Sequence, residues 1–404
     1  MAYGGVREIE DMLDGCGDVI VLADPSRDVI QIDESGVPDG FTGVLVSTSG
    51  STGTPKTVML SRDALIGAAN ASLDRLGGPG AWANPLPGWY VAGLMTVVRG
   101  LVAGMGCTTL SPHLEDLRPA RGTAYISLVP AQLHRALSDK EIRRSLASYS
   151  AVLVGGAHLN DALRAQAEQA GITVVTTYGM SETCGGVVYD GVPLSGVEIQ
   201  LLDEDGLSPG AEGRGMYATA GDNRTQDDPR RQKTTLPSFC ATDEGPNGPD
   251  SARDGRIRII SPTVFDGYLG DPEQTAWVRH GNSFLTNDRG RLLDGRLTVM
   301  GRVDDVVQSG GTNVDLAEIQ HLLDAGFPHQ VACFAQPDPV WGSTVIVAST
   351  GPSLDQIWTK LAPHLDSAAR PRGILHVGAL PRTSSGKIDR ETMTKMWRNS
   401  GERA

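Results

Sequence analysis

The stretch 46–61, which reads VSTSGSTGTPKTVMLS, gathers hydroxyl side chains, glycines and one lysine between apolar residues. Glycines let a backbone turn so that its N–H groups face an anion, and hydroxyls add further donors, so phosphate binding is one interpretation. The strict phosphate-loop pattern G-x-x-x-x-G-K-[ST] is missed at one position, because Pro55 replaces the second glycine and brings no N–H. A flexible surface linker is the competing interpretation.

The segments beside this loop favour the phosphate interpretation. Residues 43–48 and 57–61 are short β-type runs, and a helix is expected only from the candidate N-cap Ser61 to the candidate stop Gly77. A linker rarely lies between two β-type runs with a lysine at its exit, whereas the usual phosphate loop leads from a strand straight into a helix. We therefore interpret the loop as a phosphate-binding loop of another kind.

Composition limits the classes of function. The chain has 404 residues, 40% of them hydrophobic, and a net charge of −13, which predicts two or three soluble domains and argues against a nucleic-acid or anionic-membrane surface. The cysteines lack metal-site spacing and are odd in number, and no signal core or membrane span is visible, so we expect a cytoplasmic protein. They are Cys16, Cys107, Cys184, Cys240 and Cys333.

An alternating pattern between residues 123 and 178 predicts a parallel sheet. Strand patterns at 123–129, 151–156 and 172–177 alternate with helix patterns at 130–137 and 159–171. Ligands bind beyond the carboxyl ends of such strands, so the residues that follow the three strands are expected to face one site.

Two later segments differ from this region. Residues 222–254 are polar, carry prolines and show no periodicity, which predicts a flexible insertion and leaves a lid as the alternative. After residues 301–307 the pattern is that of a small α/β unit, with helices at 316–326 and 354–365 and strands at 330–336 and 343–350. We predict a large domain at 1–301 and a small domain at 302–404.

Five motifs in this order resemble the acyl-adenylate-forming superfamily, which includes acyl-CoA synthetases, adenylation domains of peptide synthetases, and luciferase. The motifs are TSGSTGTPK (48–56), YGMSET (178–183), TNDRG (286–290), GRVDDVVQSGGTNV (301–314) and PRTSSGKIDR (381–390). The resemblance implies an α/β fold, with a large N-terminal domain containing parallel βαβ sheets and a smaller mobile C-terminal α+β domain. It also implies ATP, Mg²⁺ and coenzyme A as cofactors and a small-molecule carboxylate as substrate.

The resemblance assigns residues to ATP. Without it, Glu182 would be read as a solvated carboxylate and Tyr178 as core filler. With it, Glu182 becomes the Mg²⁺ ligand and a catalytic residue, Tyr178 stacks on adenine, and Ser51 joins the catalytic residues. The remaining residues expected to contact the nucleotide are Thr48, Ser49, Gly50, Ser51, Thr52, Gly53, Thr54, Lys56, Gly155, Gly156, Ala157, Gly179, Met180 and Ser181.

The ribose and the domain movement are assigned in the same way. Asp288 alone would be a turn former and Lys387 a mobile surface lysine. By resemblance Asp288 accepts the ribose hydroxyls, Arg302 donates to the same sugar, and Lys387 neutralises charge between the carboxylate and the α-phosphate. Asp304 falls at the family's hinge, about which the small domain rotates before thioester formation.

Within the superfamily, the chain looks most like actinobacterial o-succinylbenzoyl-CoA synthetases of menaquinone biosynthesis. This resemblance rests on the short region of roughly 47 residues before the loop and on the stretches 85–104, 127–137 and 152–159. Trp89-Tyr90 departs from the histidine pair expected there, and the insertion is a second departure. Another aryl- or acyl-CoA ligase, an enzyme that loads a carrier protein, and a non-catalytic nucleotide-binding protein stay open as alternatives. Neither the acyl acceptor nor the choice between monomer and homodimer follows from the sequence.

Overall fold

The computed structural model describes residues 5–17, 19–22, 36–48, 56–202, 253–309, 311–383 and 387–400. The predicted phosphate-loop residues Ser49, Gly50, Ser51, Thr52, Gly53 and Thr54 lie outside the described residues, as does 222–252 of the predicted insertion. The end of that insertion corrects the prediction. Residues 253 and 254 open strand β12 (Arg253–Ile260), where Asp254 pairs in register with Arg291 and accepts two hydrogen bonds of 2.6 Å from its guanidinium.

The predicted parallel sheet is confirmed. Strands β6 (Ala124–Leu128), β7 (Ala151–Val154) and β8 (Val174–Met180) are parallel neighbours, so their carboxyl ends share one edge of the sheet. The sheet continues through four further strands in the order β10-β9-β8-β7-β6-β4-β5. These are β4 (Ala81–Asn84), β5 (Cys107–Thr109), β9 (Gly185–Tyr189) and β10 (Val192–Pro193).

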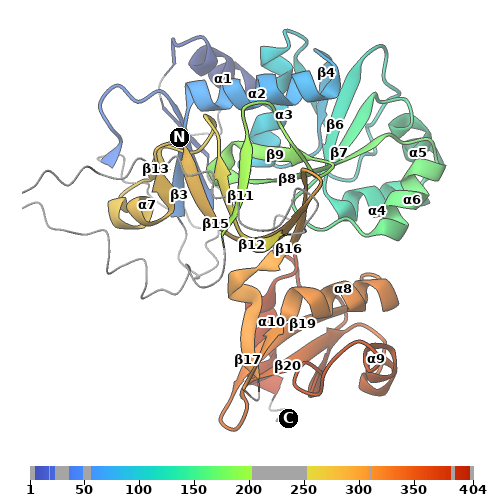
Figure 1. The fold of residues 1–404 in the computed structure, drawn as a ribbon. Coiled ribbons are helices and arrows are strands. Elements are labelled where there is room, and N and C mark those ends of the chain that lie inside the picture. Colours follow the sequence, from blue (N-terminus) through green and yellow to red (C-terminus); the bar gives the residue numbers. More distant parts are fainter. Residues whose placement is uncertain are drawn as a thin grey trace, which may run out of the picture.

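Helices cover this sheet (Figure 1). Helix α2 (Arg62–Leu76) begins after Ser61 and ends at Gly77, whose φ of 93° is the left-handed conformation that favours glycine. Helix α3 (Val91–Val102) packs on α2 and β4, and α4 (Pro130–Ser138) and α6 (Asp161–Gln169) fill the predicted crossovers. A further helix, α5 (Lys140–Leu146), was not predicted; Asp139 caps it by accepting hydrogen bonds from two backbone N–H groups.

The chain around the phosphate loop forms a second sheet. Strands β2 (Gly43–Thr48) and β3 (Lys56–Ser61) are antiparallel, which confirms the predicted strand, loop and strand. Strand β1 (Ile20–Leu22) and strand β13 (Gly267–Tyr268) extend the sheet on either side, and α1 (Val6–Leu13) packs nearby. The pair β3–β13 joins residues more than 200 positions apart in the sequence, so Tyr268 is carried next to Val58.

A third, antiparallel sheet carries the TNDRG motif. Its order is β11-β12-β15-β14, with β16 paired to β15. The motif lies within β15 (Ser283–Leu293), and β16 (Arg296–Arg302) ends where the predicted small domain begins. The remaining elements are β11 (Glu198–Leu202), β14 (Arg279–His280) and helix α7 (Pro272–Val278).

The C-terminal elements form a separate body with its own sheet and apolar cores (Figure 1). We call this the small body and the rest the large body. The sheet order is β18-β17-β20-β19, with β21 beside β20. Its strands are β17 (Val306–Ser309), β18 (Thr312–Asp315), β19 (Val331–Asp338), β20 (Gly342–Ser349) and β21 (Gly373–His376), and its helices are α8 (Leu316–Gly326), α9 (Leu354–Leu361) and α10 (Arg390–Ser400).

The predicted fold class is therefore confirmed: a mixed α/β body with a parallel sheet precedes a smaller α+β body. The division at residue 301 stays a prediction. No helix within the described ranges combines the length and the apolar character that crossing a membrane requires.

Candidate active site

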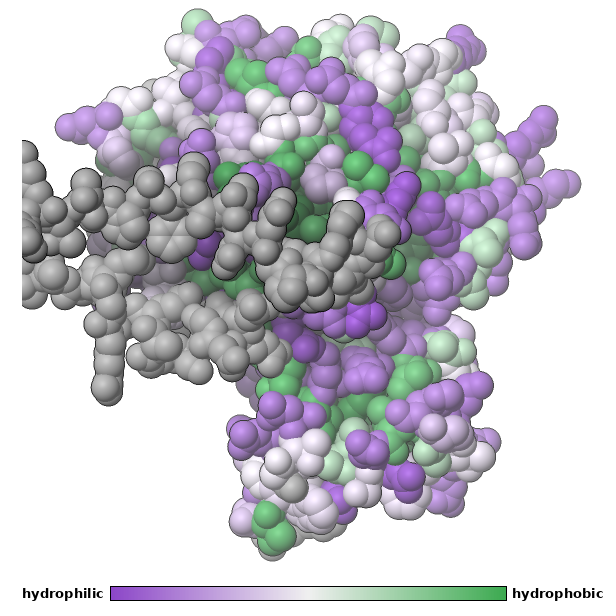
Figure 2. Space-filling view, viewed as in Figure 1, coloured by the Kyte–Doolittle hydropathy of each residue, from purple (hydrophilic) through white to green (hydrophobic). Residues whose placement is uncertain are grey.

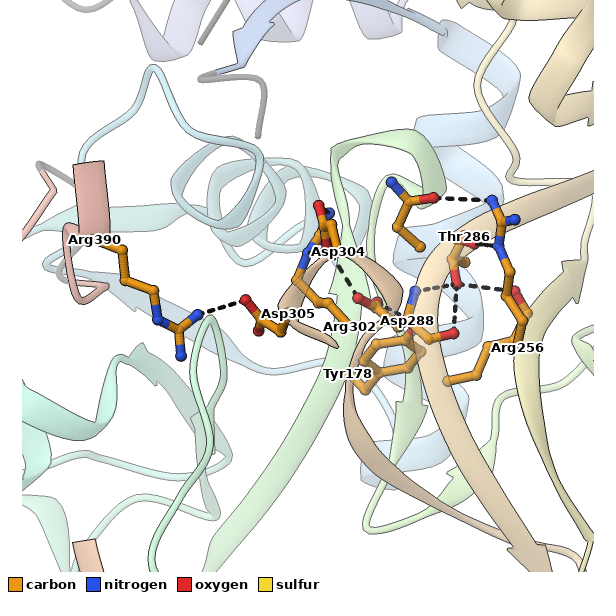
Figure 3. A network of polar contacts seen from close by, with 10 residues as sticks. Tyr178, Arg256, Thr286, Asp288, Arg302, Asp304, Asp305 and Arg390 are labelled. Carbon is orange, nitrogen blue, oxygen red and sulfur yellow. Dashed lines mark hydrogen bonds and ion pairs between the residues drawn. The ribbon is translucent and has the colours of Figure 1, made fainter. Parts of the chain in front are cut away.

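Asp288 lies at the centre of a network of polar contacts (Figure 3). The Tyr178 hydroxyl, from the end of β8, donates to Oδ2 of Asp288 at 2.7 Å, and Arg302 reaches Oδ1 at 3.4 Å. The backbone N–H of Asp288 donates to the Thr286 hydroxyl at 3.0 Å, which fixes the carboxylate on its strand. Two predicted nucleotide residues that are 110 positions apart are thus in direct contact.

Burial raises the pKa of Asp288, while the Tyr178 hydrogen bond and the charges of Arg302 and Lys387 lower it. The residue is 8% exposed. A buried carboxylate stays charged only when donors satisfy its oxygens, and a sugar with two adjacent hydroxyls would add such donors. Stacking of Tyr178 on adenine stays a prediction, because the contact present in the structure is made by its hydroxyl.

Glu182 is held by two contacts from one segment of the chain. Tyr268 donates from its hydroxyl to Glu182 Oε1 at 2.8 Å, and the Phe265 N–H donates to the Glu182 backbone carbonyl at 2.8 Å. The Lys56 ammonium lies 4.9 Å from the centre of the Tyr268 ring, in cation–π geometry. This contact ties Lys56, at the exit of the phosphate loop, to the residue that holds Glu182, and the predicted contact of Lys56 with nucleotide stays a prediction.

The turn around Glu182 is built from small residues. The Thr183 hydroxyl accepts from the Met180 N–H at 3.0 Å and contacts the Gly185 carbonyl at 2.7 Å, closing a short 3₁₀ turn over Ser181–Thr183. A side chain on Gly179 would lie 1.9 Å from the Gly185 carbonyl oxygen, so β8 and β9 approach too closely there for any other residue. Glycine is thus required at position 179 for the close approach of the two strands, and its contact with nucleotide stays a prediction.

Gly155, Gly156 and Ala157 follow β7 on the same sheet edge as Tyr178. A Cβ on Gly155 would lie 2.3 Å from the Thr177 hydroxyl oxygen, and Gly156 has a φ of 80°. The parallel pairing of β7 and β8 places these residues and the YGMSET turn at the same edge of the sheet, and a common site there stays a prediction. Their contact with nucleotide stays a prediction.

Lys387 comes from a hairpin of the small body. Arg382 bridges Ile388, and the Thr383 N–H donates to the Lys387 carbonyl at 2.8 Å. Desolvation lowers the pKa of the Lys387 amine, and the charges of Asp288 and Glu182 oppose this change. Lys387 keeps contact with solvent. The charges of both carboxylates thus act on the Lys387 amine, and a catalytic role for the three residues together stays a prediction.

The predicted hinge lies between two anchors. Asp304 accepts two hydrogen bonds from Arg302, of 2.7 and 2.9 Å, whereas Asp305 accepts one from Arg390 of α10 at 2.7 Å. Arg302 ends β16 of the large body, and Arg390 belongs to the small body (Figure 3). The side chains of residues 304 and 305 are therefore held by different bodies. The peptide bond that joins these two residues is where we expect one body to rotate against the other.

Comparisons with known proteins agree with this geometry. The model of the family described as AMP-binding enzyme matches residues 42–221. A probable 2-succinylbenzoate–CoA ligase of Mycobacterium tuberculosis is 33% identical over 378 residues, covering 88% of this chain and 85% of that relative. This chain belongs to the acyl-adenylate-forming family of AMP-binding enzymes. Within the family, a 2-succinylbenzoate–CoA ligase of Enterococcus faecalis is 28% identical and covers 85% of this chain and 67% of that relative.

A solved family structure has the same fold. The o-succinylbenzoate coenzyme A synthetase of Bacillus subtilis in complex with AMP superposes with a TM-score of 0.67 at 22% identity, covering 87% of this chain and 68% of that one. The resemblance on which the sequence predictions rest is confirmed.

Sequence motifs did not identify every residue at this family site. Tyr268, which fixes Glu182, lies in a plain turn sequence, and its role depends on the pairing of β13 with β3. Arg256 of β12 donates to the Thr286 carbonyl and to the Asn287 side chain, which holds the TNDRG motif from behind. The sequence does not single out Arg256, because its strand also contains Arg253 and Arg258.

Trp89 and Tyr90 stand directly before α3, with ring centres 6.1 Å apart. Trp89 packs against the apolar core under α2 and α3, and Tyr90 occupies the N-cap position of α3. Whether they change the gating usual in the family stays a prediction.

The two bodies of the enzyme also meet through α8. Arg289 of β15 forms an ion pair with Asp315, the N-cap of α8, and a Cβ on Gly301 would lie 2.5 Å from that of Ala317. Figure 2 shows mostly hydrophilic residues on the visible face where the bodies meet. Such a seam can open with little exposure of apolar surface, as a rotating family domain requires.

Two histidine pairs lie across this seam, and in each pair a ring of the large body faces a ring of the small body. The rings of His158, just beyond Ala157, and His321 of α8 have centres 4.5 Å apart. Those of His134 on α4 and His329 after α8 have centres 4.7 Å apart. Both pairs join the large body to the small body.

His158 and His329, one ring of each pair, resist protonation in this arrangement. Burial and His321 lower the pKa of His158, whereas Asp161 and Asp324 raise it. For His329, burial lowers the pKa, as do His134 and Arg382, and Asp324 raises it. Because the neutral forms of His158 and His329 are favoured here, these two rings stabilise the arrangement most above the ordinary histidine pKa, and their contribution is lost as pH falls below it.

As pH is lowered from about 7.5 to about 5.5, we therefore expect the adenylation rate of the wild-type protein to fall. This fall should be steeper than in a variant whose seam histidine is replaced by a residue that does not titrate. Replacing His158 with glutamine keeps a neutral polar group and should flatten this acid limb in pyrophosphate-exchange measurements. His280→Gln, at an exposed position of β14, is the matched control and should keep the wild-type profile. Identical profiles for all three proteins would contradict the expectation.

Glu182 stays the predicted protein ligand of the family's Mg²⁺. The residues that the structure describes contain no group of three or more His, Cys, Asp or Glu side chains able to hold a metal by themselves. Mg²⁺ in nucleotide enzymes is usually held by one or two carboxylates together with phosphate oxygens and waters, so Glu182 alone suffices for the protein's share.

Proposed function

We propose that this chain is an AMP-forming ligase that joins a carboxylic acid to coenzyme A through an acyl-adenylate, with o-succinylbenzoate as the acid. The observation that carries the proposal is that Lys387 of the small body lies within electrostatic range of Asp288 and Glu182 of the large body. A cation that acts on a carboxylate proposed to bind the nucleotide and on a carboxylate proposed to bind Mg²⁺ would be suited to a reaction at the α-phosphate of ATP.

In the first step a carboxylate oxygen of the acid attacks the α-phosphorus of ATP. The phosphorus–oxygen bond to pyrophosphate breaks, which leaves the acid joined to AMP as a mixed anhydride. Asp288 and Arg302 would hold the ribose, and Lys387 would offset negative charge between the attacking carboxylate and the α-phosphate. Glu182 would hold Mg²⁺, which neutralises phosphate charge when bound.

In the second step the sulfur of coenzyme A attacks the acyl carbonyl carbon. The thiol proton passes to solvent, the carbon–oxygen bond to AMP breaks, and a thioester forms. The small body would first rotate at Asp304, so that Lys387 leaves and residues 308–313 take its place. The polar seam and the two anchors beside the hinge support this movement.

The choice of acid is supported by the relatives. The ligases of Mycobacterium tuberculosis and Enterococcus faecalis are both named for 2-succinylbenzoate, and the first covers most of this chain. The product would be o-succinylbenzoyl-CoA, an intermediate of menaquinone biosynthesis.

The test is a panel of acids with ATP, Mg²⁺ and coenzyme A, with products identified by mass spectrometry. We expect the kcat/KM for o-succinylbenzoate to exceed those for benzoate and a medium-chain fatty acid by about 10²-fold or more. A second set of reactions replaces coenzyme A with a phosphopantetheinylated carrier protein.

Each result excludes one alternative. Faster turnover of benzoate or the fatty acid would refute the assigned acid, and preference for the carrier protein would refute the assigned acceptor. Absence of carboxylate-dependent pyrophosphate release would indicate a nucleotide-binding protein without catalysis.

A further inference from the structure

Arg390 links the hairpin that carries Lys387 to the chain just after the hinge. It is the first residue of α10 and follows Lys387 by three positions. One terminal nitrogen of its guanidinium donates to Asp305 Oδ1 at 2.7 Å (Figure 3), and its Nε donates to the Cys333 carbonyl of β19 at 3.1 Å. Bonds from two different nitrogens fix the plane of the guanidinium, so Arg390 holds three segments of the small body in one arrangement.

The Arg390–Asp305 pair is better shielded from water than the pair on the other side of the hinge. The side chains of Arg390 and Asp305 are 32% and 18% exposed, whereas those of Arg302 and Asp304 are 41% and 39% exposed. Solvent therefore weakens the Arg302–Asp304 pair more, although that pair has two hydrogen bonds. We expect the torsion change at Asp304, with Asp305 moving as part of the small body.

The hairpin that carries Lys387 is fixed to the same body. The Lys387 N–H donates to the Thr383 hydroxyl at 3.2 Å. Asp389 accepts at 2.9 Å from the N–H of Thr392 in the first turn of α10, as an N-cap does. Helix α10 in turn buries Met393 in an apolar core of the small body. The backbone at Lys387 is thus connected through short contacts to Arg390 and to the core behind it.

We propose that Arg390 is a positioning residue for Lys387, which converts a torsion change at Asp304 into a defined movement of the lysine. The inference rests on the proposed function and adds to it the side chain that couples the hinge to the proposed catalytic lysine. With the Arg390–Asp305 pair in place, Asp305, β19 and the hairpin move together, so Lys387 reaches one position in the adenylating orientation. Without the pair, the chain after Asp304 gains further free torsions, and the lysine is placed less precisely.

The residues expected at the site in the second step are held by other contacts. Gln308 and Ser309 of β17 pair in register with residues 312 and 313 of β18, and Ser309 also pairs with Gly342 of β20. The Ser309 hydroxyl donates to the Ala368 carbonyl at 3.0 Å. These contacts do not involve Arg390, so its loss is expected to act mainly on adenylation.

A purely structural role for Arg390, limited to packing α10 against β19, predicts different behaviour. A structural arginine would affect both half-reactions alike, and by the same factor whether or not Lys387 is present. A positioning residue acts through Lys387, so its loss should matter little once the lysine has been removed.

The experiment measures both half-reactions of Arg390→Met and Asp305→Ala, alone and combined with Lys387→Ala, with the acid that wild type turns over fastest. For each single variant we expect adenylation, read as pyrophosphate release in a single turnover, to fall by roughly 10–10²-fold. Thioester formation from preformed acyl-adenylate should fall by less than about 3-fold, and so should adenylation when either change is added to Lys387→Ala.

Arg398→Met is the matched control, because it removes an exposed arginine from the same helix. Both of its rates should stay at the wild-type level. Asp305→Ala separates the two contacts of Arg390, because it removes the ion pair and keeps the bond to the Cys333 carbonyl.

The outcomes separate this inference from the proposed function. With wild type active, equal losses in the two half-reactions, or the same loss with and without Lys387, would overturn the role of Arg390 alone. Wild-type adenylation by Asp305→Ala would also overturn it, because Arg390 would then act through β19 only. If wild type adenylates no acid, the proposed function fails and this inference with it. If Arg390→Met does not fold, the same comparisons made with Asp305→Ala decide the question.

Discussion

Replacing Lys387 with alanine is expected to slow adenylation by roughly 10²–10³-fold and to leave thioester formation from preformed acyl-adenylate near the wild-type rate. The reason is the position of Lys387 in each of the two arrangements of the small body. In this arrangement the charges of Asp288 and Glu182 act on the Lys387 amine. If the small body rotates before the thiol attacks, the lysine has left the site by the second step, and its loss cannot slow that step.

The two half-reactions can be measured separately. Pyrophosphate release in a single turnover reports adenylation, and thioester formation from chemically made o-succinylbenzoyl-AMP and coenzyme A reports the second step. Lys395→Ala is the matched control, because Lys395 lies on α10 of the same body and pairs with Glu391 at 2.6 Å on the surface. Its loss should leave both rates unchanged.

An equal loss in both half-reactions for Lys387→Ala, in a protein that folds and binds ATP, would contradict the two-orientation account. It would mean that the lysine serves one fixed site throughout the reaction. A loss confined to the second step would contradict the assigned role of Lys387 altogether.

Local pattern predicted most of the elements. The helix at 316–326 has apolar residues at helical spacing and a preceding aspartate as N-cap, and the structure places α8 over the same residues. Helix α5 was missed because its seven residues follow α4 after a single residue, Asp139. Strands of two residues, such as β13, give no periodic signal at all.

The residues of the candidate site also fall into two groups, those that local motifs identify and those that only tertiary packing brings together. Glu182, Asp288 and Lys387 could be placed from motifs, because each sits in a short stretch with a recognisable order of residue types. Tyr268 could not, since it meets Glu182 only after the pairing of strands remote in sequence.

Long-range placement also explains the other residues that sequence did not reveal. The facing histidines come from two bodies whose arrangement no local pattern encodes. Contacts made by tertiary packing carry little signal in the residues that make them.

Replacing Asp304 with proline is expected to give the pattern opposite to that of Lys387→Ala, with adenylation retained and thioester formation reduced by about 10²-fold. Residues 303–305 form a 3₁₀ turn in the present arrangement, which suits the fixed φ of proline. Rotation of the small body needs new backbone torsions at this point. Proline in an incompatible conformation costs about 3 kcal/mol, enough to reduce the rotated population by two orders of magnitude.

The substitution also removes the carboxylate that accepts from Arg302, so a second variant is needed to separate the two effects. Asp304→Ala loses the same hydrogen bonds, of 2.7 and 2.9 Å, and keeps a free backbone. It should therefore catalyse both half-reactions, with a modest change at most, because the side chains of the Arg302–Asp304 pair are 41% and 39% exposed and solvent weakens such a pair. If Asp304→Ala matched Asp304→Pro in the thioester step, the lost ion pair would account for the defect. If neither variant were impaired, the pivot would lie elsewhere, and the anchoring of Asp304 and Asp305 to different bodies would have a static role only.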